Sequence, residues 1–145
     1  MTKKRTVTVT GELEVPAGFL WQTISDFEHI DQWTDLKVRA INGSGIGCTR
    51  AVEMESGLLV TERLLVCDSL QMVFRYDILE PNPYPMRDYI ASATVKRISE
   101  QRSRLEWSGS YVAVEGADPA RTDRLLEKVY RNGIVRLQQH YAKAV

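Results

Sequence analysis

Residues 47–66 have the sequence GCTRAVEMESGLLVTERLLV, and the fold can be worked out from this stretch. Polar and apolar residues alternate on both sides of Ser56-Gly57-Leu58, which predicts two strands joined by a tight, glycine-containing connection. The predicted inner face carries Arg50, Val52 and Met54 on the first strand, and Val60, Glu62, Leu64 and Val66 on the second. A charge on a core-facing surface is costly unless it is paired or faces a cavity. The hairpin therefore predicts a lined pocket in which Arg50 and Glu62 approach each other.

The composition favours one globular domain spanning residues 1–145. Hydrophobic residues make up 43% of the chain and charged residues 26%, which are ordinary values for a folded domain. The 19 basic and 19 acidic side chains give a formal net charge of zero, so we expect no nucleic-acid partner. No apolar run approaches the roughly 20 residues that span a bilayer, and no apolar segment follows the basic Met1–Arg5 as it would in a signal peptide. We expect a cytoplasmic protein without stable membrane insertion.

The N-terminal part predicts one strand followed by two short helices. Residues 6–15 alternate between polar and apolar side chains, as in a half-buried strand. Pro16 suits the first turn of a helix, and apolar residues recur at helical spacing from Phe19 to Phe27. A break at Ser25-Asp26 separates this helix from a second one around residues 29–33.

The remainder predicts an antiparallel meander and a long final helix. Strands are expected at residues 36–41, 48–54, 59–67, 71–79, 88–98 and 103–114. Pro81, Pro83 and Pro85 cannot all lie in a sheet, so the segment that contains them is predicted to be a stiff loop. A helix over residues 119–141, with Asp118 as its cap, carries an apolar stripe of Leu125, Leu126, Val129, Tyr130, Ile134, Leu137 and Tyr141. Gly133 lies on this stripe and predicts a close approach of the helix to the sheet.

The order of elements predicts an α+β fold of the helix-grip type. Such a fold has a curved antiparallel sheet of about seven strands around a long C-terminal helix, with two short helices after the first strand. The chain resembles the superfamily that contains START domains, the birch pollen allergen, and the polyketide cyclase/dehydrase and lipid-transport proteins. The resemblance covers nearly the whole chain and is carried by Val15-Pro16-Ala17, Leu20-Trp21, Ile24 to Phe27, Trp33, Gly45 to Gly47, Arg50, Thr61 to Leu64, Asp88-Tyr89 and Leu105 to Ser108.

The central hairpin is also similar to that of plant abscisic acid receptors. Their Ser-Gly-Leu gate loop corresponds to Ser56, Gly57 and Leu58, and their latch loop to Pro85, Met86 and Arg87. Leu59 stands where the receptors have proline, and Thr34 aligns with their carboxylate-binding lysine, so the resemblance does not extend to abscisic acid recognition. The lachrymatory factor synthase of onion is similar in carrying an arginine and a glutamate on these two strands, where they serve its chemistry.

Arg50 and Glu62 are the candidate catalytic residues, and three roles stay open for them. Glu62 would remove a proton next to a carbonyl group while Arg50 stabilised the developing oxyanion. Alternatively, the pair orients the hairpin and contacts a ligand without chemistry, or does neither.

Aromatic and aliphatic side chains on the expected concave face are the candidate ligand contacts. The aromatic residues on this face are Trp33, Phe74, Tyr76, Tyr89, Trp107 and Tyr111, most of which also belong to the expected core. The expected ligand-binding residues are Val52, Val60, Leu64, Tyr76, Tyr89, Trp107, Tyr111, Ile134 and Leu137, lining a cavity of a few hundred cubic ångströms between sheet and helix.

We expect neither a metal site nor a cofactor. Cys48 and Cys67 lack ligand spacing, and His29 and His140 are far apart without carboxylate partners at such spacing. Residues 43–47 join two strands and open no helix, so their glycines predict a hairpin turn rather than a phosphate loop.

The sequence therefore predicts binding of a small, largely hydrophobic molecule, polyketide-, lipid- or terpenoid-like, in a central cavity. One alternative is a cyclase, dehydratase or isomerase that acts through Arg50 and Glu62. Another is a ligand-gated interaction protein that uses residues 56–58 as its partner surface. The chain is expected to be a monomer or a homodimer.

Overall fold

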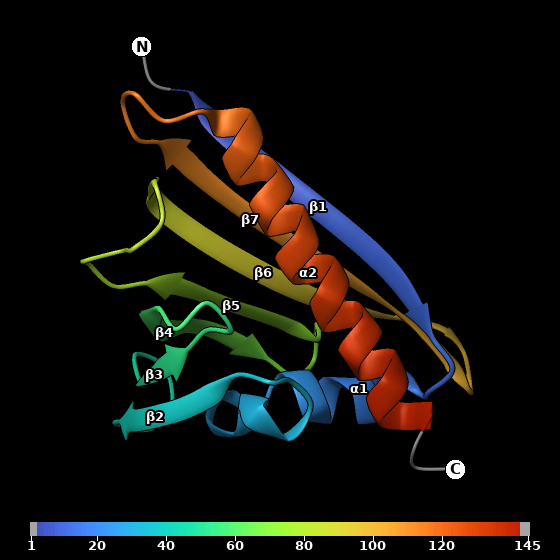
Figure 1. Ribbon diagram of the computed structural model, residues 1–145. Helices are drawn as coiled ribbons and strands as arrows, with labels where there is room; N and C mark the ends of the chain where they lie inside the picture. The colour runs from blue at the N-terminus through green and yellow to red at the C-terminus, as the bar shows by residue number, and fades with distance from the viewer. Residues whose placement is uncertain (1–2, 143–145) are drawn as a thin grey trace.

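The computed structural model describes residues 3–142 and confirms the helix-grip arrangement (Figure 1). Seven antiparallel strands form one sheet in the order β1-β7-β6-β5-β4-β3-β2. The strands are β1 (Lys4–Leu13), β2 (Lys37–Asn42), β3 (Thr49–Glu53), β4 (Leu59–Asp68), β5 (Val73–Ile78), β6 (Met86–Ser99) and β7 (Arg102–Ala113). The helices are α1 (Ala17–Ile24), the 3-10 helix η1 (Phe27–Gln32) and α2 (Pro119–Ala142).

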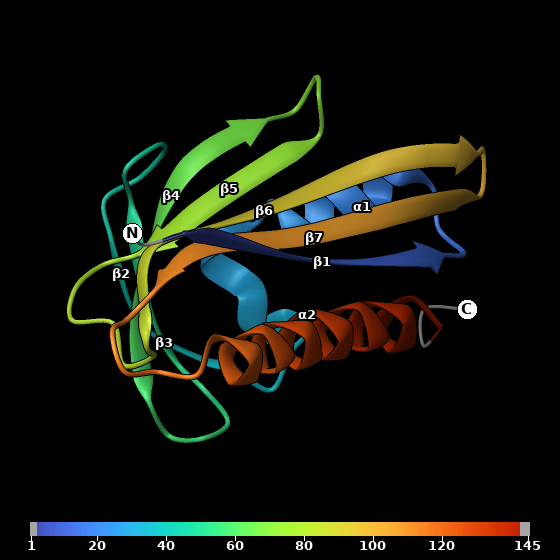
Figure 2. The same ribbon diagram turned by 90° about the horizontal axis from the view of Figure 1, so that it is seen from above.

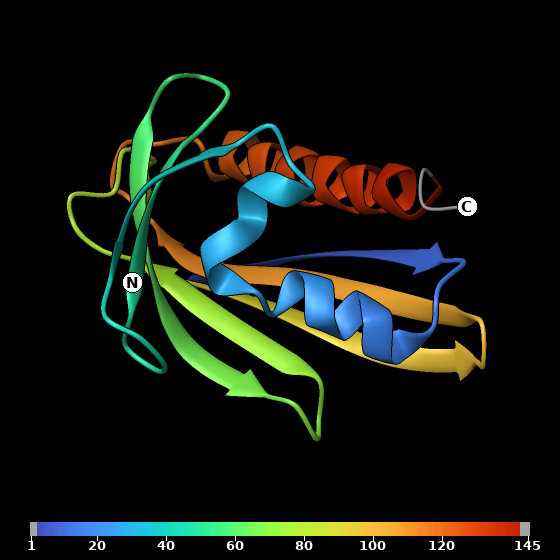
Figure 3. The same cartoon turned by 90° about the horizontal axis from the view of Figure 1, so that it is seen from below.

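The sheet curves around α2, and α1 and η1 lie across the remaining part of the concave face (Figures 2 and 3). Register shifts interrupt the β2–β3, β4–β5 and β6–β7 ladders, and such bulges bend and twist strands. One shift falls between Leu64 and Val66, so Val66 pairs with the exposed Arg75. The expectation that Val66 shares the inner face with Leu64 is therefore wrong, because a bulge reverses the alternation beyond it.

The helix α2 lies close to β7 because two glycines remove side chains from the contact. A Cβ atom on Gly133 would lie 2.5 Å from the Trp107 ring, and one on Gly109 would lie 2.0 Å from the Tyr130 hydroxyl. The expected close approach at Gly133 is confirmed. The Asp118 side chain accepts a hydrogen bond from the Ala120 N–H at 3.1 Å, so Asp118 caps the N-terminus of α2 as predicted.

Several predicted boundaries differ by one or two residues, and one residue expected to be buried is exposed. β6 begins at Met86 rather than at Asp88, so Met86 and Arg87 are strand residues paired with Ala113 and Val112. Val129 was expected on the buried stripe of α2, but it is 36% exposed. The buried residues of α2 are Thr122, Leu126, Tyr130, Gly133, Ile134 and Leu137.

Candidate functional site

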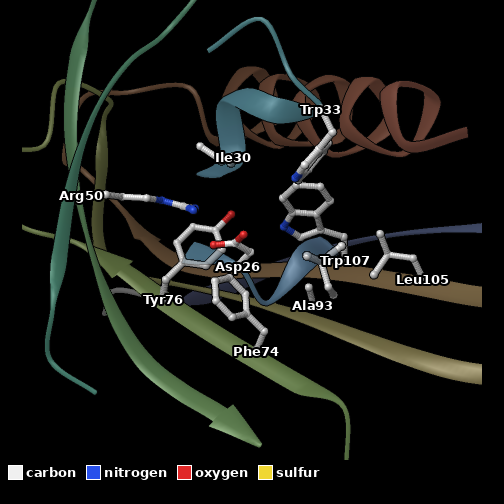
Figure 4. A pocket seen from close by; sticks show the side chains of 10 residues that line it. Asp26, Ile30, Trp33, Arg50, Phe74, Tyr76, Ala93, Leu105 and Trp107 are labelled. Carbon is white, nitrogen blue, oxygen red and sulfur yellow. The ribbon is translucent and has the colours of Figure 1, made fainter. Parts of the chain in front are cut away.

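A hollow of about 20 Å³ lies between η1 and the concave face of the sheet (Figure 4). This volume accommodates roughly one water molecule. Apolar and aromatic side chains dominate its lining, which consists of Ile24, Asp26, Ile30, Trp33, Arg50, Phe74, Tyr76, Ala93, Leu105 and Trp107.

Arg50 is the buried cation of this site, with only 3% of its side chain exposed. Its Nε donates to Oε1 of Glu62 at 2.8 Å, and its Nη1 donates to the Phe27 carbonyl oxygen at 2.8 Å. The guanidinium also lies 4.2 Å from the centre of the Phe27 ring and 5.5 Å from that of Tyr76. A guanidinium removed from water is stable only if other groups compensate its charge, and these contacts with η1 and the sheet do so.

The predicted approach of Arg50 and Glu62 is confirmed. The two residues are directly paired across β3 and β4, and the neighbouring pair Val52 and Val60 is buried beside them. Glu62 is 14% exposed and is absent from the lining of the hollow, whereas Arg50 lines it. The Glu62 carboxylate therefore contacts Arg50 but does not border the hollow itself. The catalytic role of the pair stays a prediction.

Tyr76 and Trp107, two of the expected ligand contacts, also line the hollow, and both bring a polar atom to it. Burial raises the pKa of Tyr76 well above its usual value, and the Glu62 carboxylate adds to the effect, so the hydroxyl stays neutral. The indole Nε1 of Trp107 is buried and makes no hydrogen bond of good geometry within residues 3–142, although it lies near enough to the Tyr76 hydroxyl to oppose part of the rise in the Tyr76 pKa. An unpaired buried donor is unusual, because most such groups have a partner.

Two other expected contacts serve the packing of α2 instead. The Tyr89 hydroxyl lies 2.5 Å from that of Tyr130 in the core. The Tyr111 hydroxyl donates to Asp123 at 2.5 Å, close to the pair that Asp123 forms with Arg5. Burial, with the hydrogen bond to Asp123, raises the pKa of Tyr111 to about 12. The remaining expected contacts are buried but do not line the hollow: Val52, Val60, Leu64, Ile134 and Leu137.

The hollow is much smaller than the few hundred cubic ångströms expected between sheet and helix, and aromatic packing explains the difference. Trp107 stacks on Tyr130 with ring centres 5.2 Å apart and planes inclined by 17°. Gly133 and Gly109 allow these rings to come this close to the opposing backbone. The space between α2 and the sheet is therefore filled at this contact, and the hollow lies beneath η1.

Asp26 is a lining residue that the sequence pattern did not single out. It was expected only as a break between helices, and that interpretation says nothing about where its side chain points. Its Oδ1 lies 2.8 Å from Nδ1 of His29, and this contact raises the pKa of His29. His29 thus has a carboxylate partner three residues earlier, at a spacing that brings helical side chains together.

The two expected gate segments lie at the end of the molecule where α2 begins (Figures 2 and 3). In the β3–β4 connection, Leu58 is 41% exposed and the following Leu59 is 56% exposed. Met86, in the second segment, is only 3% exposed and anchors the start of β6. A polar surface cleft of about 370 Å³ adjoins the β3–β4 connection and is lined by Asp35, Lys37, Glu53, Met54, Glu55 and Arg136.

Neither a metal cluster nor a membrane-spanning helix is found within the described residues. Between residues 3 and 142, no three His, Cys, Asp or Glu side chains are grouped as a metal site would require. In the same range no helix combines the length and the apolar character needed to cross a bilayer.

Comparisons with solved structures show the same fold in bacterial proteins. An uncharacterized protein from Bacillus thuringiensis is 24% identical, with a TM-score of 0.83 over 95% of this chain and 99% of that one. The protein XoxI from Bacillus cereus is 25% identical, with a TM-score of 0.81 over 92% and 93% of the two chains. A Thermobifida fusca protein is 22% identical, with a TM-score of 0.74 over 95% and 93%.

No curated protein matches the chain. Residues 4–142 match the family described as polyketide cyclase / dehydrase and lipid transport. Since this match covers nearly every residue of the seven-stranded sheet and its three helices, the chain belongs to the polyketide cyclase/dehydrase and lipid-transport family.

Proposed function

We propose that this protein binds a small, largely hydrophobic molecule, polyketide-, lipid- or terpenoid-like, in the hollow beneath η1. The observation that carries the proposal is the composition of the lining, in which apolar and aromatic side chains surround one buried guanidinium. Ligand sites typically combine a mostly apolar wall with a few placed polar groups. The family to which the chain belongs supports the same class of ligand.

Binding requires the hollow to enlarge, and η1 is the wall best suited to move. Ligand pockets usually measure about 300–1,000 Å³, far more than the free volume here. Only Phe27 and Ile30 of the six η1 residues are buried, and the backbone at His29 departs from helical geometry. Outward movement of η1 would expose Phe27 and Ile30, and it would give up the contacts of the Phe27 ring with Arg50 and Phe74 and the hydrogen bond from Arg50 to the Phe27 carbonyl.

Native mass spectrometry and titration with Nile red, an uncharged apolar dye, test the proposal. We expect a co-purified small molecule or saturable dye binding, with one site per chain. Ala93 lines the hollow, so Ala93→Val should weaken dye binding several-fold by filling it. Ala91 is equally buried on the same strand but lies outside the lining, so Ala91→Val is the matched control for overpacking.

The proposal is wrong if no small molecule co-purifies and the dye does not saturate. It is also wrong about the location if the two valine variants weaken binding equally while both remain folded by circular dichroism. Native mass spectrometry also reports whether the chain is a monomer or a homodimer.

Catalysis by Arg50 and Glu62 is a second candidate function, supported by the position of Arg50 at the hollow. The reaction would be a cyclisation, dehydration or isomerisation of the bound molecule, with Arg50 stabilising an oxyanion and Glu62 accepting the proton. Its test is consumption of enolisable ketones by the protein, compared with Glu62→Gln. No consumption by either protein would leave binding as the function.

A ligand-gated interaction is a third candidate, supported by the exposed Leu58 and Leu59 in the β3–β4 connection. It requires a protein partner that binds only when the hollow is occupied. A partner that binds equally well without ligand would contradict this function.

A further inference from the structure

We infer that the inner end of the hollow is a subsite for one neutral, hydrogen-bond-accepting oxygen, of the kind that a ketone or quinone carries. The inference rests on the proposed function and names the group by which the bound molecule is recognised.

Hydrogen-bond donors converge on this end of the hollow from three elements. Arg50 on β3 uses Nε and Nη1 for Glu62 and the Phe27 carbonyl, while Nη2 donates to no group among residues 3–142. The Trp107 Nε1 on β7 is buried, and its nearest acceptor, the Tyr76 hydroxyl, lies outside good hydrogen-bond geometry. Figure 4 shows the indole nitrogen of Trp107 facing the Tyr76 hydroxyl and the guanidinium, with that of Trp33 on the same side.

These groups determine which kind of atom fits between them. Arginine and indole nitrogens only donate, whereas the Tyr76 hydroxyl can donate or accept. An ammonium group has no lone pair and would leave these donors unpaired, whereas a carbonyl or hydroxyl oxygen has two lone pairs and can accept from two of them. A carbonyl oxygen fits best, because it needs no acceptor in return. The free volume of about 20 Å³ is large enough for a single atom of this size.

The charges around the hollow favour a neutral oxygen over a carboxylate. The Glu62 carboxylate, 2.8 Å from the Arg50 Nε, already compensates the guanidinium. Asp26 on the opposite wall adds another negative charge, which is shared with His29. A buried carboxylate ligand would therefore find no uncompensated cation, and burying an unpaired charge is costly.

Acetophenone and ethylbenzene are suitable probes because they have nearly the same shape and differ in one carbonyl oxygen. Their affinities are measured by titrating 15N-labelled protein and following the indole N–H signals of Trp21, Trp33 and Trp107. We expect acetophenone to shift the Trp107 signal downfield, as a new acceptor does, and ethylbenzene to leave it without this shift. Trp107→Phe keeps an aromatic ring but removes the N–H, so it should weaken acetophenone binding about 5- to 10-fold more than ethylbenzene binding.

Trp21→Phe is the matched control, because Trp21 is buried in α1 but does not line the hollow. It should leave the ratio of the two affinities within about twofold of the unmodified protein. Benzoate tests the charge argument: Glu62→Gln removes the compensating carboxylate and should strengthen benzoate binding relative to acetophenone.

Each outcome separates this subsite from the proposed function. If both probes bind but Trp107→Phe changes their affinities equally, the subsite is wrong and hydrophobic binding stands. If Trp21→Phe changes the ratio as much as Trp107→Phe does, or if Glu62→Gln leaves benzoate no better bound relative to acetophenone, the subsite is also wrong. If neither probe binds, the proposed function fails for molecules of this size and the subsite fails with it.

Discussion

The Nε of Arg50 lies 2.8 Å from Oε1 of Glu62 at directly opposed positions of β3 and β4. The guanidinium is almost fully buried, whereas the Glu62 side chain is 14% exposed. Water can therefore solvate the carboxylate in part but hardly reaches the guanidinium. The guanidinium also holds the first residue of η1 through the Phe27 carbonyl. One side chain thus connects the hairpin, the hollow and the wall that covers it.

Arg50→Ala should destabilise the protein by about 3 kcal/mol, because it leaves the Glu62 carboxylate and the Phe27 carbonyl without their donor. Glu62→Gln keeps an acceptor oxygen for Arg50 but leaves the buried guanidinium uncompensated, so it should cost about 2 kcal/mol, less than Arg50→Ala. Urea unfolding monitored by tryptophan fluorescence measures both changes. An equal loss of stability in the two variants would contradict the argument that Arg50 contributes more to stability than Glu62 because it is more deeply buried.

Gly133→Ala should destabilise the protein even though alanine is the better helix former by about 1 kcal/mol. The new Cβ atom would lie 2.5 Å from the Trp107 ring, and overpacking of this kind costs about 1–3 kcal/mol. Gly18→Ala in α1 is the control, since no atom lies within 4 Å of its added Cβ, and it should leave stability unchanged or raise it. Stabilisation by Gly133→Ala would mean that α2 and β7 can separate at little cost.

The Asp123 carboxylate should make the protein less stable in acid. The hydrogen bond from Arg5 is the main cause of its lowered pKa, and the Tyr111 hydroxyl contributes in the same direction. A carboxyl whose pKa is lower in the folded state stabilises the fold above its unfolded pKa of about 4, and this stabilisation is lost as the pH falls through the folded value. Asp123→Asn should therefore flatten the stability profile between about pH 5 and pH 2, measured by urea unfolding at each pH. An unchanged profile would assign the acid dependence to other carboxylates.

The Tyr111 hydroxyl should make the stability of the protein depend on pH in the alkaline range. Its pKa is raised to about 12, above its ordinary value of about 10, so its contribution is complete below pH 10 and is lost as the pH rises towards 12. Tyr111→Phe removes a hydrogen bond to the Asp123 carboxylate and should cost about 1.5 kcal/mol at neutral pH. The difference between the two proteins should shrink above pH 10, as thermal unfolding would show. A constant difference up to pH 12 would contradict this role for the hydroxyl.

The β3–β4 connection should gain protection from amide exchange when the hollow is occupied. Leu58 and Leu59 are exposed in the β3–β4 connection, and movement of this connection over a bound molecule would bury them. Hydrogen exchange of residues 56–59, with and without saturating Nile red, measures the change. Residues 43–47 of the β2–β3 turn are the internal control. Equal behaviour of the two connections would mean that the first is a simple turn.

The hairpin shows how much of the site is determined by the sequence. Alternation alone places Arg50, Val52, Val60 and Glu62 on one face, because a strand presents every second residue to the same side. A cation and a carboxylate on a face that is otherwise apolar then imply a pair, and the structure contains it. The order of strands and helices follows from patterns of the same local kind, so the helix-grip fold could be predicted with its two short helices and its long final one.

The tertiary structure alone decided the size of the hollow and its position. Strand alternation for Trp107 and Tyr89, and helical spacing for Tyr130, show that these side chains point inward, but not whether their rings pack against one another or border free space. The close approach of α2 at Gly133 stacks Trp107 on Tyr130 and fills the volume that the fold type suggests for a ligand. The side of the sheet on which Val66 lies likewise depends on a bulge in β4. Periodicity specifies the direction of a side chain, whereas free volume is set by distances between elements remote in sequence.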